Sequence, residues 1–171
     1  LIESTGMKIL VATEKPFAKE AVDGIRRIVE DAGYELALLE KYTDKAQLLA
    51  AVADVDALIV RSDKVTAEVI EAARNLKIVV RAGAGYDNVD LAAATARGIV
   101  VMNTPGQNSN AVAELALAMM VFMSRNRFTP GTGTEIQGKT LGIHAYGNVG
   151  RLVGRKGKAL GMHVVAYDPF I

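Results

Sequence analysis

The sequence predicts a doubly wound α/β protein, in which helices cover both faces of a parallel β-sheet. Three observations support this fold class. Short runs of apolar and β-branched residues alternate with stretches in which apolar residues recur at every third or fourth position. The strand-like runs are apolar throughout, which is typical of strands buried on both faces. Hydrophobic residues make up 50% of the 171-residue chain, which is enough to form a core of this kind.

The first part of the chain is expected to contain five strands, each followed by a helical stretch or a turn. The apolar positions between Phe17 and Val29 lie on one face of a helix, and Gly33 marks its end. The expected strands cover residues 8–12, 35–39, 57–60, 77–80 and 99–102, and the further helices cover 46–55, 67–73 and 89–97. These repeats predict one flavodoxin-like lobe over residues 7–104, with Met7 as its start.

A second domain is expected over residues 105–171. It begins with a turn and a long apolar helix over 110–125, for which Asn110 is the expected N-cap residue. A segment rich in glycine and threonine then forms a loop. The alternation resumes with a strand over 140–145, a helix over 148–160 and a strand over 163–167. A single βαβ unit cannot cover its own sheet, so apolar surface is expected to be exposed here.

Charge and composition exclude several classes of protein. The formal net charge is +1, which argues against a broad basic surface for nucleic acid or anionic membranes. The chain has no cysteine, which excludes disulfides, thiolate nucleophiles and cysteine-ligated zinc, and fits a cytoplasmic setting. The longest apolar run, over residues 111–123, contains Glu114 and is shorter than the roughly 20 residues that span a bilayer.

Two segments match phosphate-binding patterns, and the first match is coincidental. Residues 133–140 fit G-x-x-x-x-G-K-[ST]. That motif requires a strand before it and a helix after it, so that loop amides and the helix N-terminus face the phosphates. Here a loop precedes the match and a strand follows it. The segment is therefore interpreted as a polar turn leading into a strand.

The second match, at residues 145–150, has the expected context. A strand precedes it, a helix follows it, and the next strand ends at Asp168, close to the interval of about 20 residues that the Rossmann fingerprint shows. Gly147 would let the backbone approach a pyrophosphate, Gly150 would allow close helix–strand packing, and the amides of Asn148 and Val149 would face the phosphates. Asp168 would bind the ribose hydroxyls, which favours NAD over NADP. Residues 105–171 are therefore expected to be a partial NAD-binding Rossmann domain.

Two points of this motif remain open in the sequence. Alanine stands at position 145 in place of the first glycine, and it is tolerable there only if its φ is negative. The alternative to a binding site is an ordinary βαβ corner with coincidental glycines. Gly154 and Gly157 favour the binding site. Each glycine costs a helix about 1 kcal/mol relative to alanine, and close packing of the helix against the sheet would be a reason for at least one of them.

Polar residues follow the strands of the first lobe, at the sheet edge where doubly wound proteins bind ligands. Arg61 comes after one strand, Arg81, Gly83 and Ala84 after the next, and Asn103 after the last. A guanidinium binds carboxylate or phosphate with two hydrogen bonds, and small residues let backbone amides reach a ligand oxygen. The expected ligand is a small acid with one or two negative groups. The alternative is local ion pairing, of Arg61 with Asp63 or of Arg81 with Asp87.

The two histidines, His144 and His163, have no acidic partner at a spacing that would orient them for proton transfer. Both are interpreted as structural residues. Tyr146 is expected near the cofactor without an evident acid or base role, and no metal site is expected.

Several segments in one order resemble the D-2-hydroxyacid dehydrogenases, and within that family the phosphoglycerate dehydrogenases. The resemblance covers residues 7–171. The matching segments are VRS at 60–62, RAGAGYDNVD at 81–90, VMNTP at 101–105, AEL at 113–115, GKTLGI at 138–143, the glycine turn, and YDP at 167–169.

The resemblance implies NAD-dependent oxidation of 3-phosphoglycerate to 3-phosphohydroxypyruvate in serine biosynthesis, with Arg61 and Arg81 holding the substrate. It implies that the Gly83 and Ala84 amides meet the substrate carboxylate, and that Asn148, Val149 and Asp168 hold NAD. The family's catalytic arginine, glutamate and histidine have no counterpart here, so this chain is expected to be an inactive N-terminal piece with no catalytic residue of its own. A homodimer through the helix over 110–125 is also implied. The alternatives are a binding protein that senses NAD and a dehydrogenase for another small 2-hydroxy acid.

Overall fold

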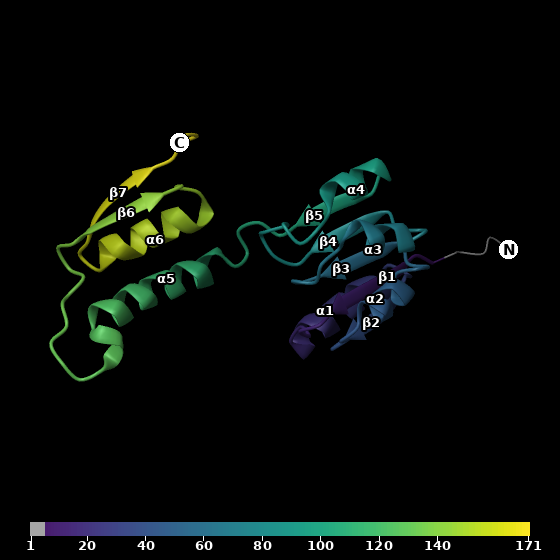
Figure 1. Cartoon of the computed structure of the whole chain (residues 1–171), viewed down its shortest axis with the longest axis horizontal. Helices are drawn as coiled ribbons and strands as arrows, with labels where there is room; N and C mark the ends of the chain where they lie inside the picture. Colours follow the sequence, from purple (N-terminus) through teal and green to yellow (C-terminus); the bar gives the residue numbers. More distant parts are fainter. Residues whose placement is uncertain (1–5) are drawn as a thin grey trace. The chain divides into compact units, whose positions relative to one another are not determined.

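The computed structural model describes residues 6–171, and the chain divides into two compact units, Leu1–Pro105 and Gly106–Ile171 (Figure 1). Most of the residues that precede the expected start at Met7 lie outside the described part. Within residues 6–171, no helix is long and apolar enough to cross a membrane.

The first unit is built from alternating strands and helices, as the apolar pattern predicts. Its elements are β1 (Lys8–Thr13), α1 (Lys19–Asp31), β2 (Glu35–Glu40), α2 (Lys45–Ala51), β3 (Ala57–Val60), α3 (Ala67–Ala72), β4 (Ile78–Arg81), α4 (Leu91–Ala96) and β5 (Val100–Asn103). Helix α2 ends at Ala51 rather than at residue 55. Val52 and Val55, in the turn that follows, are still fully buried, so the apolar pattern continues beyond the helix.

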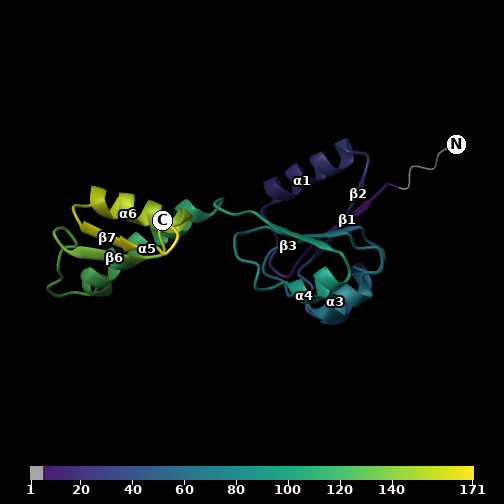
Figure 2. The ribbon, with the colours of Figure 1, turned by 90° about the horizontal axis from the view of Figure 1, so that it is seen from above.

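All five strands of the first unit are parallel, in the order β2-β1-β3-β4-β5. This is the flavodoxin-like order, so the predicted fold class is confirmed. Helices α2, α3 and α4 contact one another in sequence, while α1 lies on the opposite face of the sheet (Figure 2).

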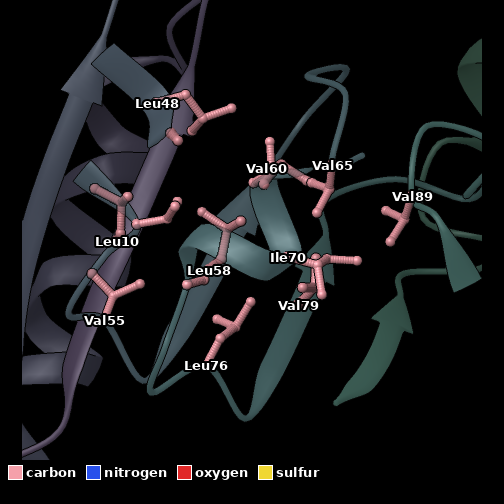
Figure 3. Close-up of a cluster of buried hydrophobic side chains, with 14 of the residues drawn as sticks. Leu10, Leu48, Val55, Leu58, Val60, Val65, Ile70, Leu76, Val79 and Val89 are labelled. Carbon is pink, nitrogen blue, oxygen red and sulfur yellow. The ribbon is translucent and has the colours of Figure 1, made fainter. Parts of the chain in front are cut away.

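The core of the first unit lies between the sheet and the α2–α4 layer. Figure 3 shows it as a group of apolar side chains that includes Leu48 of α2, Ile70 of α3 and Val89. Strands β1, β3 and β4 contribute Leu10, Leu58 and Val79, each of which is at most 2% exposed. Burying such a side chain stabilises the fold by about 1.5–3 kcal/mol.

The opposite face of this sheet is only partly covered. Val22 and Val29 of α1 are buried against it, but Val100 and Met102 on the edge strand β5 are 54% and 53% exposed. The expectation that helices cover both faces therefore holds for the centre of the sheet and is wrong for this edge. The reason is that a single helix is narrower than five strands.

The second unit is a βαβ unit preceded by a long helix. It contains α5 (Ser109–Ser124), the short 3₁₀ helix η1 (Asn126–Phe128), β6 (Thr140–His144), α6 (Asn148–Ala159) and β7 (His163–Tyr167). Strands β6 and β7 are parallel, α6 packs on both, and α5 packs on α6. The N-cap residue of α5 is Asn108, so the prediction of Asn110 is wrong. The Asn110 side chain instead donates to Glu114 Oε1 at 2.7 Å, one turn further along the helix.

The second face of the β6–β7 sheet carries exposed apolar side chains. Val165 and Tyr167 of β7 are 57% and 64% exposed, while Leu141 of β6, which points toward the helices, is buried. The sequence predicted exposed apolar surface in this unit, and that prediction is confirmed.

Candidate functional site

The two arginines of the first unit lie together at the carboxyl edge of the sheet. Strands β3 and β4 are neighbours, with Val60 paired to Arg81 in register, so Arg61 follows directly beside Arg81. The Arg81 Nε donates to the Arg61 carbonyl oxygen at 2.8 Å. This hydrogen bond fixes the Arg81 side chain against the turn that carries Arg61.

The loop after β4 approaches the end of the Arg81 side chain closely at Gly83, so a larger residue there would displace the guanidinium. A Cβ on Gly83 would lie 1.4 Å from an Arg81 guanidinium nitrogen. The Asn103 side-chain amide donates to the Ala84 carbonyl at 2.7 Å, and the Thr104 amide donates to the Gly83 carbonyl at 2.8 Å. The carbonyls of this loop are thus held by the last residue of β5, the strand beside β4, and by the residue that follows it.

The backbone amides of the loop differ in their partners. The Gly83 N–H donates to the Arg81 carbonyl at 2.9 Å, in a three-residue turn, whereas no backbone partner is found for the Ala84 N–H within residues 6–171. A ligand carboxylate would therefore meet the Ala84 amide directly and would compete with a turn hydrogen bond for the Gly83 amide.

Local ion pairing does not occupy either arginine. Within residues 6–171, no ion pair involves Arg61 or Arg81. The Asp63 carboxylate accepts a hydrogen bond from the backbone amide of Arg61, at 3.4 Å, rather than from its guanidinium. Arg61 also lines a cavity of about 150 Å³ together with Glu14, Lys15, Ser62 and Asp63. Both guanidinium groups are consequently available to an anionic ligand.

The sequence did not reveal the role of Asp63. Its side chain is buried and accepts hydrogen bonds from the Tyr42 hydroxyl at 2.8 Å and from the Glu14 amide at 2.7 Å. Burial and the hydrogen bond to Asp63 raise the pKa of Tyr42 well above its usual value, so its hydroxyl stays protonated and donates. The only signal in the sequence is an aspartate two positions after Arg61, which alone suggests an ion pair.

In the second unit, Ala145 has a φ of +79°, so the condition under which alanine would be tolerated at this position, a negative φ, is not met. The chain must turn sharply here, because the Ala145 N–H donates to the Tyr167 carbonyl while the helix starts three residues later, at Asn148. A side chain in this region costs about 1–2 kcal/mol, which a glycine would avoid. The alanine therefore leaves strain in the loop of the fingerprint.

Replacing Ala145 with glycine is expected to stabilise the second unit by about 1 kcal/mol, because the left-handed conformation then carries no Cβ. The gain is smaller than the strain because glycine also increases the entropy of the unfolded chain. Urea unfolding followed by circular dichroism measures the change. Gly138, with a φ of +74°, offers the reverse control, since Gly138→Ala should destabilise the same unit. An Ala145→Gly variant less stable than the parent chain would contradict the prediction.

Asp168, just after β7, contacts the loop of the fingerprint. Its carboxylate accepts hydrogen bonds from the Tyr146 amide at 2.7 Å and the Phe170 amide at 2.8 Å. These two bonds, from Phe170 and then Tyr146, lower the pKa of Asp168, with the charges of Arg151 and His144 adding to the effect. A carboxylate offers about four acceptor positions, so both oxygens can still accept from ribose hydroxyls.

The N-terminus of α6 has the features of an anion site. Its N-cap residue, Gly147, provides no side-chain hydrogen bond, so the first amides, including those of Asn148 and Val149, are open to a ligand. Gly150 is buried, and a Cβ there would lie 2.2 Å from the Ala145 carbonyl oxygen. A Cβ on Gly157 would lie 2.6 Å from a Leu141 methyl group. The prediction that close packing explains the helix glycines is confirmed.

The remaining polar candidates do not form a proton-transfer site. The His144 ring lies 5.5 Å from the Tyr167 ring, and within residues 6–171 no hydrogen bond orients either histidine. Residues 133–139 form a loop that leads into β6 at Thr140, so the interpretation of this segment as a polar turn is confirmed. No cluster of metal-ligating side chains occurs in the described part of the chain.

Comparison with known proteins gives matches over most of the chain. Residues 11–162 match the profile of the catalytic domain of D-isomer specific 2-hydroxyacid dehydrogenases. The chain is 42% identical to a hydroxypyruvate reductase of Thermotoga maritima, over 79% of this chain and 49% of that protein. It is also 42% identical to a D-3-phosphoglycerate dehydrogenase of Archaeoglobus fulgidus, over 96% of this chain and 33% of that protein.

A solved structure is similar over almost the whole chain. The NAD⁺-bound 3-phosphoglycerate dehydrogenase of Entamoeba histolytica superposes with a TM-score of 0.94 and 52% identity, over 97% of this chain and 55% of that one. The chain thus spans about half or less of the length of these relatives.

Proposed function

Because the chain belongs to the D-isomer specific 2-hydroxyacid dehydrogenase family, we propose that it provides the binding residues of an NAD-dependent oxidation of 3-phosphoglycerate to 3-phosphohydroxypyruvate. The observation that carries the proposal is the pair of arginines, Arg61 and Arg81, joined by a hydrogen bond and free of ion pairs within residues 6–171. 3-Phosphoglycerate carries a carboxylate and a phosphate, the two groups that guanidinium binds with paired hydrogen bonds. We propose serine biosynthesis in the cytoplasm as its setting.

The substrate would be held by the first unit. Arg61 and Arg81 would bind its anionic groups, and the amides of Ala84 and, after its turn opens, Gly83 would bind the carboxylate. Thr104 supports this geometry because its amide holds the Gly83 carbonyl at 2.8 Å, and the Ala84 N–H lies on the opposite side of the same planar peptide group. The exposed side of Arg61, next to a cavity of about 150 Å³, leaves room for a small acid.

The cofactor would be held by the second unit. The open amides of Asn148 and Val149 would bind the pyrophosphate of NAD, Gly147 would allow its approach, and Gly150 would keep α6 close to β6. Asp168 would accept hydrogen bonds from the adenosine ribose. When bound, NAD supplies the hydride acceptor for the substrate carbon that carries the hydroxyl group. We propose that no residue of this chain takes up the hydroxyl proton, so the chain alone binds without turnover.

Calorimetric titration tests the proposal directly. We expect 3-phosphoglycerate and NAD each to bind the chain and to raise its melting temperature, since a ligand that binds only the folded state stabilises it. No NADH should form, as measured by its absorbance. Binding of NAD with no response to any 2-hydroxy acid would instead support an NAD-sensing regulator. A chain that binds neither ligand would refute both functions.

A second substrate is favoured by one comparison. The Thermotoga maritima relative is a hydroxypyruvate reductase and is as similar to this chain as the Archaeoglobus fulgidus phosphoglycerate dehydrogenase. A substrate without a phosphate would need only one of the two arginines. Comparing the affinities for 3-phosphoglycerate and D-glycerate therefore separates the two substrates.

Asp168 is expected to set the preference for NAD over NADP. Replacing Asp168 with alanine removes the ribose acceptor and the charge that repels a 2′-phosphate, so NAD should bind about tenfold more weakly and the discrimination against NADP should fall. Because its two backbone hydrogen bonds lower the Asp168 pKa, the carboxylate is charged throughout the neutral range. The stabilising effect of the charged carboxylate on the fold is present above the usual pKa of an aspartate and is lost as the pH falls through the depressed pKa. Titrations of both cofactors at several pH values measure this, and equal NAD affinity in the variant would contradict the role.

We also propose that the protein forms a homodimer through α5. The outer side of this helix carries Leu115, Met119 and Met123, which are 61%, 58% and 63% exposed. Apolar surface of this kind favours burial against a partner. Light scattering after gel filtration measures the mass, and a monomer at micromolar concentration would contradict the proposal.

A further inference from the structure

The side chain of Asp63 joins three loops at the carboxyl edge of the first sheet. Its Oδ1 accepts hydrogen bonds from the Glu14 amide at 2.7 Å, after β1, and from the Tyr42 hydroxyl at 2.8 Å, after β2. Its Oδ2 accepts a longer one, at 3.4 Å, from the amide of Arg61, after β3. We call these four residues, Glu14, Tyr42, Arg61 and Asp63, the Asp63 cluster.

The backbone of Asp63 extends this connection to the loop after β4. The Asn88 side-chain amide donates to the Asp63 carbonyl at 2.8 Å. The Val65 amide donates to the Asn88 carbonyl at 2.8 Å, and the Asp90 amide donates back to Val65. The turn that carries Arg61 is therefore tied to the loop that carries Gly83 and Ala84, as well as to the ends of β1 and β2.

Asp63 is an unusual residue to bury unless it has a defined role. The residue is 5% exposed, and no cation pairs with it within residues 6–171. A buried carboxylate is costly unless hydrogen bonds compensate the loss of water, and here backbone amides and a tyrosine hydroxyl supply them. Two of its three side-chain partners lie in other loops, and the third is the amide of Arg61 itself. The carboxylate thus ties the turn that carries Arg61 to the loops after β1 and β2 while leaving the Arg61 guanidinium free.

We infer that Asp63 is the positioning residue for Arg61, and that Tyr42 supports it. The inference rests on the proposed function, in which Arg61 binds an anionic group of the substrate. Asp63 does not touch the substrate; it determines where the Arg61 guanidinium lies.

Replacing Asp63 with asparagine tests this role with little change of shape. An amide side chain has one acceptor oxygen, so with that oxygen kept toward Tyr42 and Glu14, its NH₂ group faces the Arg61 N–H. Two donors then meet, and the turn that carries Arg61 must shift. We expect Asp63→Asn to weaken binding of 3-phosphoglycerate about tenfold, and Tyr42→Phe to weaken it less, in the same direction. NMR titration of the isotope-labelled chain measures dissociation constants up to the millimolar range.

A double-mutant cycle with Arg61→Ala separates positioning from a general loss of structure. If Asp63 acts through Arg61, then Asp63→Asn should change the dissociation constant by less than about twofold once Arg61 is alanine. If Asp63→Asn changes the dissociation constant by the same factor in the parent chain and in the Arg61→Ala variant, the inference is overturned, because Asp63 would then act independently of Arg61.

Asp56 provides a matched control at the other end of β3. It too is an aspartate that accepts a backbone hydrogen bond, from Lys8 at 3.0 Å, and it pairs with Lys77 at 2.8 Å. Asp56→Asn should destabilise the fold and leave the affinity for 3-phosphoglycerate within about twofold. If Asp56→Asn weakens binding as much as Asp63→Asn does, the loss of affinity results from lower stability of the fold, and the inference is overturned. If Arg61→Ala itself binds as tightly as the parent chain, the proposed function fails, and the inference fails with it.

Discussion

Replacing Arg81 with alanine is expected to weaken binding of 3-phosphoglycerate at least about 100-fold. A guanidinium that binds an anion with two charge-assisted hydrogen bonds contributes about 1.5–3 kcal/mol per bond. Arg81 has a second role, because its Nε holds the Arg61 carbonyl at 2.8 Å, so its loss also frees the turn that carries Arg61. The loss of affinity should therefore exceed that of Arg61→Ala. Isothermal calorimetry or NMR titration measures both variants.

Two further variants make this prediction specific. Arg81→Lys keeps the charge but has no Nε donor and no planar fork, so its affinity should lie between those of the parent and Arg81→Ala. Arg97 is the matched control, because it also donates to backbone carbonyls, those of Ala73 at 3.1 Å and Arg74 at 3.2 Å, beyond the end of α3. Arg97→Ala should lower stability and leave ligand affinity unchanged. Equal affinities of the parent chain and Arg81→Ala would refute a substrate site at the arginines.

Replacing Gly150 with alanine is expected to destabilise the second unit by about 3 kcal/mol, the upper end of the usual cost of overpacking. The added Cβ would lie 2.2 Å from the Ala145 carbonyl oxygen and 3.2 Å from an Ile143 methyl group. Backbone cannot move away as a flexible side chain can, so α6 would have to separate from β6. NAD binding should be lost together with the packing of α6 on β6. Hydrogen exchange resolved by peptide should show faster exchange over residues 140–167 and unchanged exchange in the first unit.

Gly24→Ala in α1 is the matched control for this substitution. Gly24 is also within a helix, but a Cβ there has nothing within 4 Å. The same change should therefore stabilise the first unit by about 1 kcal/mol, because alanine favours the helix. If the two substitutions change the free energy of unfolding in opposite directions, the loss of stability at Gly150 results from the close contact. A Gly150→Ala variant as stable as the parent chain would contradict this packing.

Most of the strands and helices could be predicted because each is determined by local sequence. The buried strand Lys8–Thr13 contains the uninterrupted apolar run 9–12, and the α1 residues Val22 and Val29 recur at helical spacing. The capping residue of α5 was mispredicted as Asn110 because several polar residues precede that helix, and sequence alone does not distinguish the first helical residue from the cap. The end of α2 was misplaced because Val52 and Val55 are buried in a turn rather than in a helix.

The sequence by itself determined the class of the fold, the arginines that follow neighbouring strands, and the glycine–acid spacing of the second unit. Each of these depends on residues close together in the chain or on the rule that parallel strands end at one edge. The tertiary structure decided what depends on contacts between distant segments. It gave Ala145 a positive φ, because the loop must join β6 to α6 beside β7. It also made Asp63 a buried acceptor for Tyr42 and Glu14 rather than an ion-pair partner of Arg61, because hydrogen-bond partners 21 and 49 residues away are brought together only by the sheet.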